Sequence, residues 1–438
     1  MERTLIKDLG QQLDEQVTIK GWLQTLRDQK NMQFLIIRDR TGLVQVAHWK
    51  KGNPELAELI STVGTESALT LTGKVVKNDV VKLGGIEIQL EDLKVEGAAE
   101  IPLPFEPFGE YLPEQDFRLD WRYLDLRRDV NQLIFEVQTT AEHAMREYWL
   151  QHGFIEMHSP KIVGAPSESG AELFTLPYFE KTAYLAQSPQ FYKQMAMAAG
   201  FENVFEIGPV FRADPSFTSR HMTEFTGVDM EISWIDSLED VMTFMERWLA
   251  YTYEKIIEKH GDAVKEILGV ELKVPTVPFP RIKMADAHKL LQEIGYKLPP
   301  DKLHDLDPGA ERAIGNYFKE KEGHDYVFVI DWPFEARPFY HMLDPVEQTT
   351  RSFDLLGKGL EVSTGAQREH RYEVLREQAH IKGLSDEPIQ DYLNFFKYGT
   401  PPHGGFGFGL SRFLMILLDL PNIREAVYIF RGPTRLNP

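Results

Sequence analysis

Two strand-like segments around residues 204–233 contain residues with the chemistry of a polyphosphate site. The cations and carboxylates in them are Arg212, Arg220, His221, Asp229 and Glu231. Same-parity residues on a strand share a face, so Asp229 and Glu231 are expected to point the same way. Arginine is the fork-shaped donor that suits phosphate. The segment is therefore either a hairpin that grips a polyphosphate or a solvated hairpin with ordinary surface charges.

Further residues of this kind lie toward the C-terminus. Arg412 follows PPHGGFGFG, which predicts a Gly-rich turn before a helix whose N-terminus favours an anion. Asp354 and Glu361 flank a predicted turn at 357–359 and are expected to face each other across it. Paired carboxylates that also meet phosphates indicate Mg²⁺. The alternative is that these two carboxylates are ordinary polar side chains on neighbouring strands.

Length and composition restrict the class of protein. A chain of 438 residues with 42% hydrophobic and 26% charged residues predicts two or three soluble globular domains. The net charge of −19 argues against a generic basic nucleic-acid binder. The absence of cysteine excludes disulfides and thiolate metal sites and fits a cytoplasmic location. The sequence contains no apolar run of membrane-span length and no signal peptide, so no membrane partner is expected.

The N-terminal part, 1–97, predicts a small β-barrel. Short strands fill 17–95, with one helix near 54–63, the pattern of an OB-fold that binds oligonucleotides. Phe34 and Gln45 are candidates for stacking on and reading unpaired bases, although a core position is the ordinary role for a strand phenylalanine. Four prolines between 98 and 113 indicate a linker, assigned to 98–116.

The remaining residues, 117–438, predict a larger α+β domain. Helices are expected near 131–151, from Ser188-Pro189 onward and over 237–259, and a strand pair over 351–371. Pro160 lies within the strand-like run GFIEMHSPKIV. Because proline is confined to edges, bulges and strand starts, this run is expected to border something such as a subunit interface. Residues 265–345 suggest an inserted or peripheral region of unassigned role.

Several of these motifs together resemble a known family. FRADPSFTSRHMTEF, the Pro160 run and GGFGFGLSRF resemble motifs 2, 1 and 3 of class II aminoacyl-tRNA synthetases. With the N-terminal barrel and RLDWRYLDLRR, they resemble the subclass that charges Asp, Asn and Lys, in its archaeal aspartyl form. The resemblance implies an antiparallel β-sheet flanked by helices, the substrates L-aspartate and ATP, and the cofactor Mg²⁺. It also implies the partner tRNA(Asp) and a homodimer formed through the Pro160 strand and its preceding helix.

The resemblance also implies roles by position. The catalytic residues would be Arg212 and Arg412. ATP would be bound by Arg212, Asp214, Arg220, His221, Phe225, Glu361, Gly409 and Arg412. Aspartate would be bound by Glu168, Ser188, Gln190, Lys193, Arg212, Asp229, Thr364 and Arg368. The metal ligands would be Asp354, Glu361 and Thr364, and the anticodon contacts Phe34, Gln45, Glu87 and Arg27.

The resemblance leaves the choice between aspartate and asparagine to the cations of the pocket. Lys193 and Arg368 stand at the family's aspartate-binding positions, and asparaginyl relatives lack the lysine of SPQxYKQ. A buried lysine without its carboxylate would cost several kcal/mol, which would reject the neutral asparagine. An asparaginyl enzyme is the first alternative, and Lys193 argues against it. A synthetase-like regulatory RNA-binding paralogue is the second, and the intact ATP-site residues argue against it.

Four positions depart from the family pattern. Asp214 stands where Glu is usual, Ser411 replaces a Glu before Arg412, and Gly432 replaces an Asp. Strict archaeal relatives carry a tryptophan where this chain has Gln24. The absence of that tryptophan predicts an enzyme that charges tRNA(Asn) as well as tRNA(Asp).

Overall fold

The computed structural model describes residues 2–165, 172–302 and 304–437. The chain divides into two compact units, Met1–Gln115 and Asp116–Pro438. Each unit has its own hydrophobic core.

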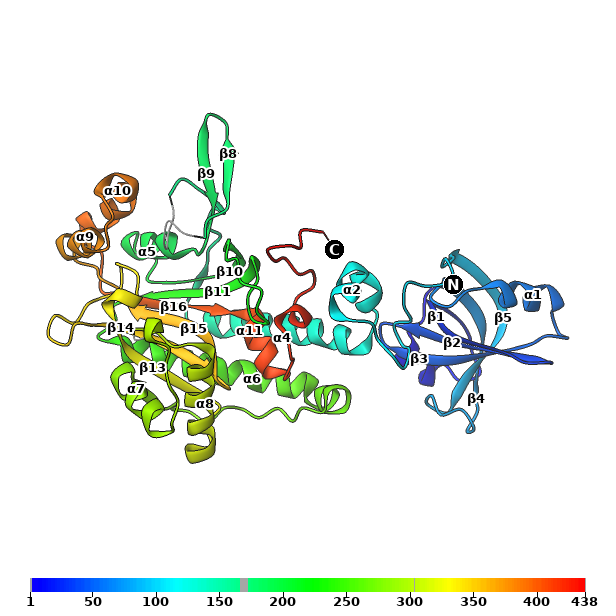
Figure 1. Ribbon diagram of the computed structural model, residues 1–438. Helices are drawn as coiled ribbons and strands as arrows, with labels where there is room; N and C mark the ends of the chain where they lie inside the picture. Colours follow the sequence, from blue (N-terminus) through cyan, green and yellow to red (C-terminus); the bar gives the residue numbers. More distant parts are fainter. Residues whose placement is uncertain (1, 166–171, 303, 438) are drawn as a thin grey trace. The chain divides into compact units, whose positions relative to one another are not determined.

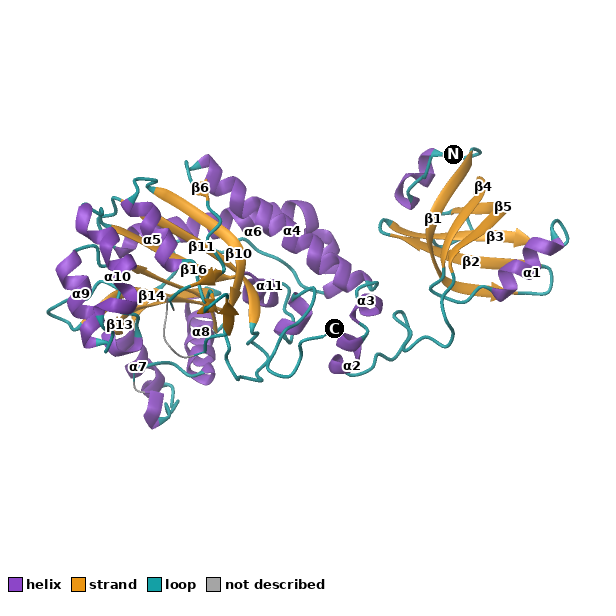
Figure 2. Cartoon of the chain, turned by 90° about the horizontal axis from the view of Figure 1, so that it is seen from above, coloured by secondary structure: helices purple, strands orange, loops and turns teal. Residues whose placement is uncertain are grey.

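The first unit is a closed five-stranded barrel, with strand order β1-β2-β3-β5-β4 (Figure 2). Its strands are β1 (Gln16–Asp28), β2 (Met32–Asp39), β3 (Gly42–Trp49), β4 (Ala68–Lys77) and β5 (Ile86–Gly97). Buried and accessible residues alternate along β2 and β4, because every second side chain enters the barrel core. Helix α1 (Pro54–Thr62) starts at Asn53, whose side chain accepts a hydrogen bond from the Leu56 N–H. The predicted OB-type barrel is confirmed.

The second unit is built on an eight-stranded sheet of order β12-β13-β14-β15-β16-β11-β10-β6. Its strands are β6 (Ile155–Glu156), β10 (Asn203–Phe211), β11 (Glu224–Ser233), β12 (Arg281–Lys283), β13 (Tyr326–Pro333), β14 (Thr349–Gly357), β15 (Leu360–Gln367) and β16 (His403–Gly409). The sheet is antiparallel from β13 to β10, whereas β12 and β6 pair in parallel at its two ends. The expectation of an antiparallel sheet therefore holds for the central strands, and the whole sheet is mixed.

Two long helices cover one face of this sheet. Helices α4 (Asp129–Gln151) and α6 (Leu238–Leu268) lie side by side (Figure 2). Trp149 of α4 stacks on Phe205 of β10, and Trp248 of α6 packs against Phe406 of β16. Ser237 and Asp240 form a capping box at the start of α6. Val228 and Met230 of β11 share this core, so Asp229 and Glu231 must face the other side.

Shorter elements surround the sheet. The remaining helices are α2 (Gln115–Asp120), α3 (Arg122–Asp125), α5 (Gln190–Ala198), α7 (Met284–Glu293), α8 (Pro308–Glu322), α9 (Tyr372–Ile381), α10 (Asp386–Phe395) and α11 (Leu410–Leu417). A separate three-stranded sheet contains β7 (Ile162–Val163), β8 (Thr175–Tyr178) and β9 (Lys181–Leu185). The β8–β9 hairpin projects from the second unit (Figure 1). Helix α5 packs on β10 and β11, where its Lys193 reaches the face that carries Asp229 and Glu231.

Residues 265–345 are not peripheral, which corrects the sequence-based expectation. They provide β12 and β13 at one end of the main sheet, together with α7 and α8. Helix α8 packs closely on the β14–β15 turn, where a Cβ on Gly315 would lie 2.5 Å from the Gly359 nitrogen. The alternation of prolines and helical patterns obscured a segment that completes the sheet.

Two further predictions about strands are wrong. The run around Pro160 is not one strand, because Pro160 lies in the coil between β6 and β7, which belong to different sheets. The Gly-rich segment before Arg412 is strand β16 rather than a turn. Glycine is needed there because a Cβ on Gly405 would lie 2.1 Å from the Met230 carbonyl oxygen.

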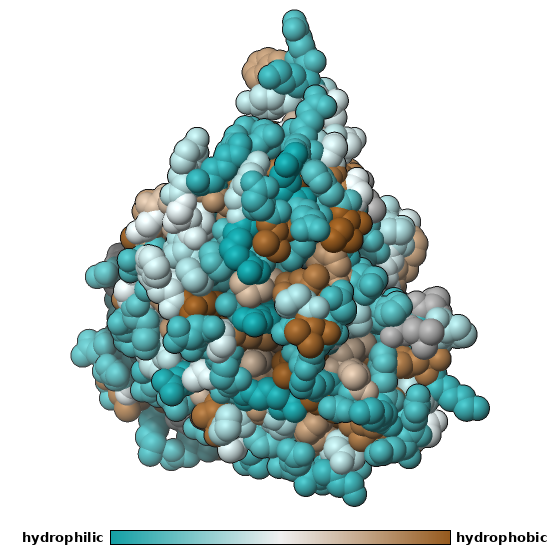
Figure 3. All heavy atoms as spheres, turned by 90° about the vertical axis from the view of Figure 1, so that its left-hand side faces the viewer, coloured by the Kyte–Doolittle hydropathy of each residue, from teal (hydrophilic) through white to brown (hydrophobic). Residues whose placement is uncertain are grey.

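The surface gives two simple observations. On the face shown in Figure 3, hydrophilic side chains predominate and hydrophobic ones form small, separate patches. Within residues 2–165, 172–302 and 304–437, each helix is too short or too polar to cross a membrane.

Candidate active site

A cavity of about 400 Å³ opens on the sheet face opposite α4 and α6. It collects residues from β10, β11, β15, β16 and α11, which lie far apart in the sequence. The sequence-predicted site residues that line it are Ser188, Gln190, Arg212, Asp214, Arg220, His221, Phe225, Asp229, Glu361, Thr364, Arg368, Gly409 and Arg412. Lys193 and Asp354 lie behind its wall, and Glu168 falls outside the described residues.

The β10–β11 hairpin supplies one wall. Arg212 follows the end of β10, is exposed, and has its guanidinium carbon 5.7 Å from the centre of the Phe225 ring. Asp214 accepts a hydrogen bond of 2.9 Å from the Ser216 N–H, which fixes the start of the hairpin tip. His221 contacts Ser216 and Thr218 within the tip, and burial lowers the pKa of its imidazole. The predicted hairpin is confirmed, with its cations facing one cavity.

The opposite wall contains the predicted carboxylate pair. Asp354 is paired across the strands with Thr364, and a bulge at Val362 separates Glu361 from that register. The Thr364 hydroxyl lies 2.7 Å from Asp354 Oδ1 and 3.2 Å from Glu361 Oε1. The two carboxylates therefore do not face each other directly across the turn, but one hydroxyl joins them.

Neighbouring arginines neutralise this pair. Arg337 lies 2.7 Å from Asp354, and Arg412 lies 3.4 Å from Glu361. Burial raises the pKa of Asp354 to about 6 although Arg337 opposes the shift. Burial also acts to raise the pKa of Glu361, but Arg412 and other arginines outweigh it and the pKa is lowered. Within the described ranges, no group of three or more acidic, His or Cys side chains could hold a metal alone.

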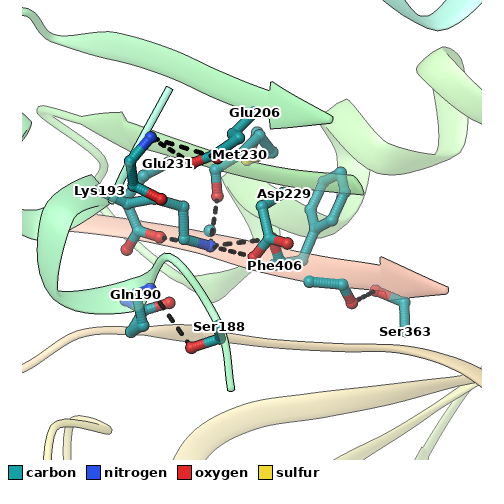
Figure 4. Close-up of polar contacts among 12 residues, drawn as sticks. Ser188, Gln190, Lys193, Glu206, Asp229, Met230, Glu231, Ser363 and Phe406 are labelled. Atoms are coloured by element: carbon teal, nitrogen blue, oxygen red, sulfur yellow. Dashed lines mark hydrogen bonds and ion pairs between the residues drawn. The ribbon is translucent and has the colours of Figure 1, made fainter. Parts of the chain in front are cut away.

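The floor of the cavity is a buried cluster of opposite charges (Figure 4). The Lys193 ammonium donates to Asp229 Oδ1 at 3.0 Å and to the carbonyls of Met230 and Phe406 at 3.3 and 3.1 Å. It also lies 3.4 Å from Glu231 Oε2. Burial raises the pKa of Asp229, with Lys193 opposing. The prediction that Asp229 and Glu231 share a face is confirmed because one lysine contacts both.

Glycines in β16 make room for this cluster. Gly405 is paired with Glu231 and Gly407 with Asp229. A Cβ on Gly405 would lie 2.4 Å from Glu231 Oε2, and one on Gly407 would lie 3.2 Å from Asp229 Oδ1. The acidic side chains of β11 therefore occupy the space above β16 that side chains would otherwise fill.

The position of Lys193 corrects the sequence-based argument about specificity. The expected rejection of asparagine requires Lys193 to lack a carboxylate partner until an acidic ligand binds. Lys193 is fully buried and already contacts Asp229 and Glu231. The cost of an unpaired lysine therefore does not arise, and Lys193 does not itself line the cavity.

Arg368 is the cation that lines the deep end of the cavity. Its guanidinium donates to Glu231 at 3.0 Å, to His341 at 2.9 Å and to Gln190 Oε1 at 3.2 Å. Burial lowers the pKa of His341 well below its usual value, with Arg368 adding to the effect, so the imidazole is a neutral acceptor. Gln190 Nε2 is buried with no hydrogen-bond partner among the described residues. Arg368 also donates to the Gly405 carbonyl at 3.1 Å, so what it presents to a carboxylate ligand at this end is its positive charge.

The structure brings three residues to the site that had no assigned role, and of these only Glu231 was already noted in the sequence as a carboxylate of the hairpin. Glu231 pairs with Arg368, Arg337 pairs with Asp354, and Glu311 of α8 pairs with Arg220 at 2.7 Å. The shared parity of Glu231 with Asp229 was a usable signal for the first. No sequence signal distinguishes Arg337 or Glu311 from surface charges.

The first unit carries the other predicted binding residues on one barrel face. Arg27 is paired with Phe34 across β1 and β2, and Gln45 is paired with Glu87 across β3 and β5. The Gln45 amide donates to Glu87 Oε2 at 3.0 Å. Phe34 is half-buried and lies outside the barrel's core cluster, so the core alternative for this side chain is wrong.

Comparisons with known proteins agree with both units. The family model for class II tRNA synthetases (D, K and N) matches residues 114–430, and that for the OB-fold nucleic acid binding domain matches 17–96. The chain is 42% identical over 426 residues to the aspartate–tRNA(Asp) ligase of Thermococcus kodakarensis, covering 97% of this chain and 96% of the relative. It is 43% identical over 427 residues to the aspartate–tRNA(Asp/Asn) ligase of Methanopyrus kandleri, with the same coverage.

A solved structure agrees with the class II family and its fold. Asparaginyl-tRNA synthetase from Pyrococcus horikoshii, in complex with asparaginyl-adenylate, superposes with a TM-score of 0.92 at 31% identity over all of both chains. Its sequence identity is lower than that of the aspartate–tRNA ligases, and the residues of the cavity come from the motifs that the class II model spans. The chain therefore belongs to the class II tRNA synthetases of the Asp, Lys and Asn group and, within it, to the aspartate–tRNA ligase family of enzymes.

Proposed function

We propose that this protein activates L-aspartate with ATP and transfers the aspartyl group to the 3′ end of tRNA(Asp). One observation carries the proposal. A single cavity joins Arg212, Arg220 and Arg412, which suit a triphosphate, to a deep end lined by Arg368, whose positive charge suits a carboxylate.

The chemistry needs no protein nucleophile. The aspartate α-carboxylate oxygen attacks the α-phosphorus of ATP, and the bond from that phosphorus to the bridging oxygen of pyrophosphate breaks. Arg212 would stabilise the negative charge that develops on the phosphoryl oxygens. A hydroxyl of the terminal ribose of tRNA then attacks the aspartyl carbonyl, and AMP leaves. The protein contributes positioning and electrostatic stabilisation.

The carboxylate pair fits Mg²⁺. Asp354, Glu361 and Thr364 would hold the ion, because the Thr364 hydroxyl joins Glu361, which lines the cavity, to Asp354 directly behind it. Two carboxylates suffice when phosphate oxygens complete the shell, which is how Mg²⁺ is usually bound beside nucleotides. When bound, Mg²⁺ would neutralise phosphate charge during pyrophosphate release.

Amino-acid-dependent exchange of pyrophosphate into ATP tests the first half-reaction. Exchange with aspartate and not with asparagine supports the proposal. Exchange with asparagine alone would instead identify an asparaginyl enzyme, and no exchange with either would leave the regulatory paralogue as the better description.

We expect the enzyme to aspartylate tRNA(Asn) as well as tRNA(Asp). The reason is Gln24, which stands where strict archaeal relatives carry tryptophan and whose side chain accepts a hydrogen bond of 3.2 Å from Arg38. The relatives at 42% and 43% identity have names of both kinds, so identity does not decide. Aspartylation of a purified tRNA(Asn) transcript is the measurement, with tRNA(Asp) as the positive control. Charging of tRNA(Asp) alone would refute the expectation.

Phe34 is proposed to stack on an unpaired anticodon base beside Gln45, Glu87 and Arg27. Phe34→Ala is expected to raise the KM for tRNA about 5-fold to 150-fold, since base–aromatic stacking contributes about 1–3 kcal/mol per base. Pyrophosphate exchange, which needs no tRNA, should stay at the wild-type rate. Phe117→Ala, at an exposed phenylalanine of the second unit, is the matched control. An unchanged KM for tRNA would remove Phe34 from the binding face.

We also propose a cytoplasmic homodimer formed through the segment of β6 and helix α4. Strand β6 is the last strand of the sheet, and Leu150 and Ile155 expose 60% and 47% of their surface beside it. Sedimentation at micromolar concentration tests the association. A monomer under those conditions would contradict the proposal.

A further inference from the structure

We infer that Glu311 is a positioning residue for ATP, acting through Arg220. The inference rests on the proposed function, in which Arg220 binds the triphosphate. Glu311 lies on α8, in the segment 265–345 to which sequence analysis gave no role. Its carboxylate is 5% exposed and contacts elements from both walls of the cavity.

The first contact holds one side of the Arg220 guanidinium. Arg220 Nη1 donates to Glu311 Oε2 at 2.7 Å, and Arg220 lines the cavity. Arg220 Nε is buried and has no hydrogen-bond partner among the described residues. A guanidinium is planar and its donors have fixed directions, so an anchor at Nη1 also fixes where the remaining donors point. Arg220 is therefore held by Glu311 in one orientation, with its side chain lining the cavity at a site that suits phosphate.

The second contact reaches the carboxylate wall. Glu311 Oε2 also accepts the backbone N–H of Glu361 at 3.2 Å. One oxygen atom thus joins the tip of the β10–β11 hairpin to the start of β15, beside a proposed metal ligand. Glu311 Oε2, as the acceptor shared by both, therefore sets the distance between Arg220 and Glu361.

Helix α8 gives this acceptor a rigid base. Asp307 caps the helix by accepting from the Ala310 N–H at 2.7 Å. Ile314 and Phe318, on later turns, are buried in a core shared with Val327 and Val329 of β13. Gly315 packs directly against Gly359 in the β14–β15 turn. A side chain on such an element positions its partner better than one on a loop.

A competing role predicts the opposite result. Glu311 would compete with phosphate for Arg220 if the guanidinium had to leave the carboxylate in order to bind ATP. Removal of Glu311 would then strengthen ATP binding. Removal of a positioning carboxylate weakens it, because Arg220 becomes free to adopt other rotamers.

The test compares Glu311→Ala and Glu311→Gln in aspartate-dependent pyrophosphate exchange. Glu311→Ala is expected to raise the KM for ATP about tenfold, the effect of losing one hydrogen bond to a charged group. The KM for aspartate should stay within about twofold of wild type, since Glu311 contacts no residue of the deep end. Glu311→Gln keeps an acceptor oxygen without the charge and should raise the KM for ATP about threefold. Glu320→Ala, on the exposed surface of the same helix, is the matched control and should match wild type.

A double-mutant cycle separates positioning from general damage. Arg220→Ala should raise the KM for ATP at least as much as Glu311→Ala, and the double variant should be no worse than Arg220→Ala alone. Additive effects, an unchanged KM for ATP, or a lower KM for ATP would each overturn the inference. If Glu311→Ala does not fold, Glu311→Gln carries the same cycle. Failure of wild type to exchange with aspartate would instead refute the proposed function.

Discussion

Replacement of Lys193 by methionine is expected to lower the free energy of unfolding of the second unit by about 3–5 kcal/mol, the cost of breaking a buried ion pair from one side. Methionine fills a similar volume but leaves Asp229 without its hydrogen-bonded cation. Glu231 keeps Arg368 and is less affected. Chemical denaturation at neutral pH measures the loss, and aspartate-dependent exchange should fall with it because Asp229 lines the cavity.

The pH dependence gives a second test of the same variant. Burial already raises the pKa of Asp229, and removal of Lys193 removes the main opposing influence. The folded state then holds a proton that the unfolded state releases, so stability falls as pH rises between the unfolded and folded pKa of this carboxyl. The stability deficit of Lys193→Met should therefore be smaller at about pH 5 than at about pH 8.

Two further variants complete this experiment. Adding Asp229→Asn to Lys193→Met should recover part of the lost stability, because an amide carries no charge to bury, but should not restore exchange. Lys321→Met, at an exposed position of α8, should leave the free energy of unfolding unchanged. A Lys193→Met protein as stable as wild type would show that Asp229 is not charged in the folded state.

Replacement of Arg212 by alanine is expected to lower the catalytic rate and to leave the free energy of unfolding almost unchanged. The kcat of aspartate-dependent exchange should fall about 100-fold to 1,000-fold, the range found when one preorganised donor to a developing charge is removed. The free energy of unfolding should change by less than about 0.5 kcal/mol, because Arg212 is an exposed side chain. Steady-state kinetics and denaturation of the same preparation measure both quantities.

A control separates the loss of this arginine from the loss of positive charge in general. Arg247→Ala removes an exposed arginine from α6, outside the cavity, and should retain wild-type kcat and stability. A normal kcat for Arg212→Ala would exclude it as a catalytic residue. A large loss of stability would mean that its contact with Phe225 supports the hairpin.

The sequence predicted those parts of the site whose geometry depends only on the alternation of side chains along a strand. The parity of Asp229 and Glu231 placed both carboxylates on one face, and the hairpin that carries Arg212 was recognisable from its strand-forming residues. The barrel strands followed from the same alternation. These predictions succeeded because each depends on neighbours within a few residues.

The errors arose where distant segments decide the outcome. A glycine-rich run forms a strand here because it pairs with β11, whose Asp229 and Glu231 fill the space above Gly407 and Gly405 although they lie far earlier in the sequence. Nothing in the sequence of α8 separates Glu311 from an exposed glutamate on an amphipathic helix. The sequence predicted that Lys193 would bind the ligand. Only the fold shows that Lys193 already contacts two buried carboxylates, Asp229 and Glu231.

The glycines of β16 also limit how this site can change during evolution. A side chain at position 405 would meet both the Met230 carbonyl oxygen at 2.1 Å and Glu231 Oε2 at 2.4 Å, so a smaller residue at 231 removes only one of the two clashes. Loss of Glu231 would leave Arg368 without its buried carboxylate. Gly405 is therefore expected to be kept even in a lineage that has altered residue 231, because the backbone of β11 excludes a side chain at position 405.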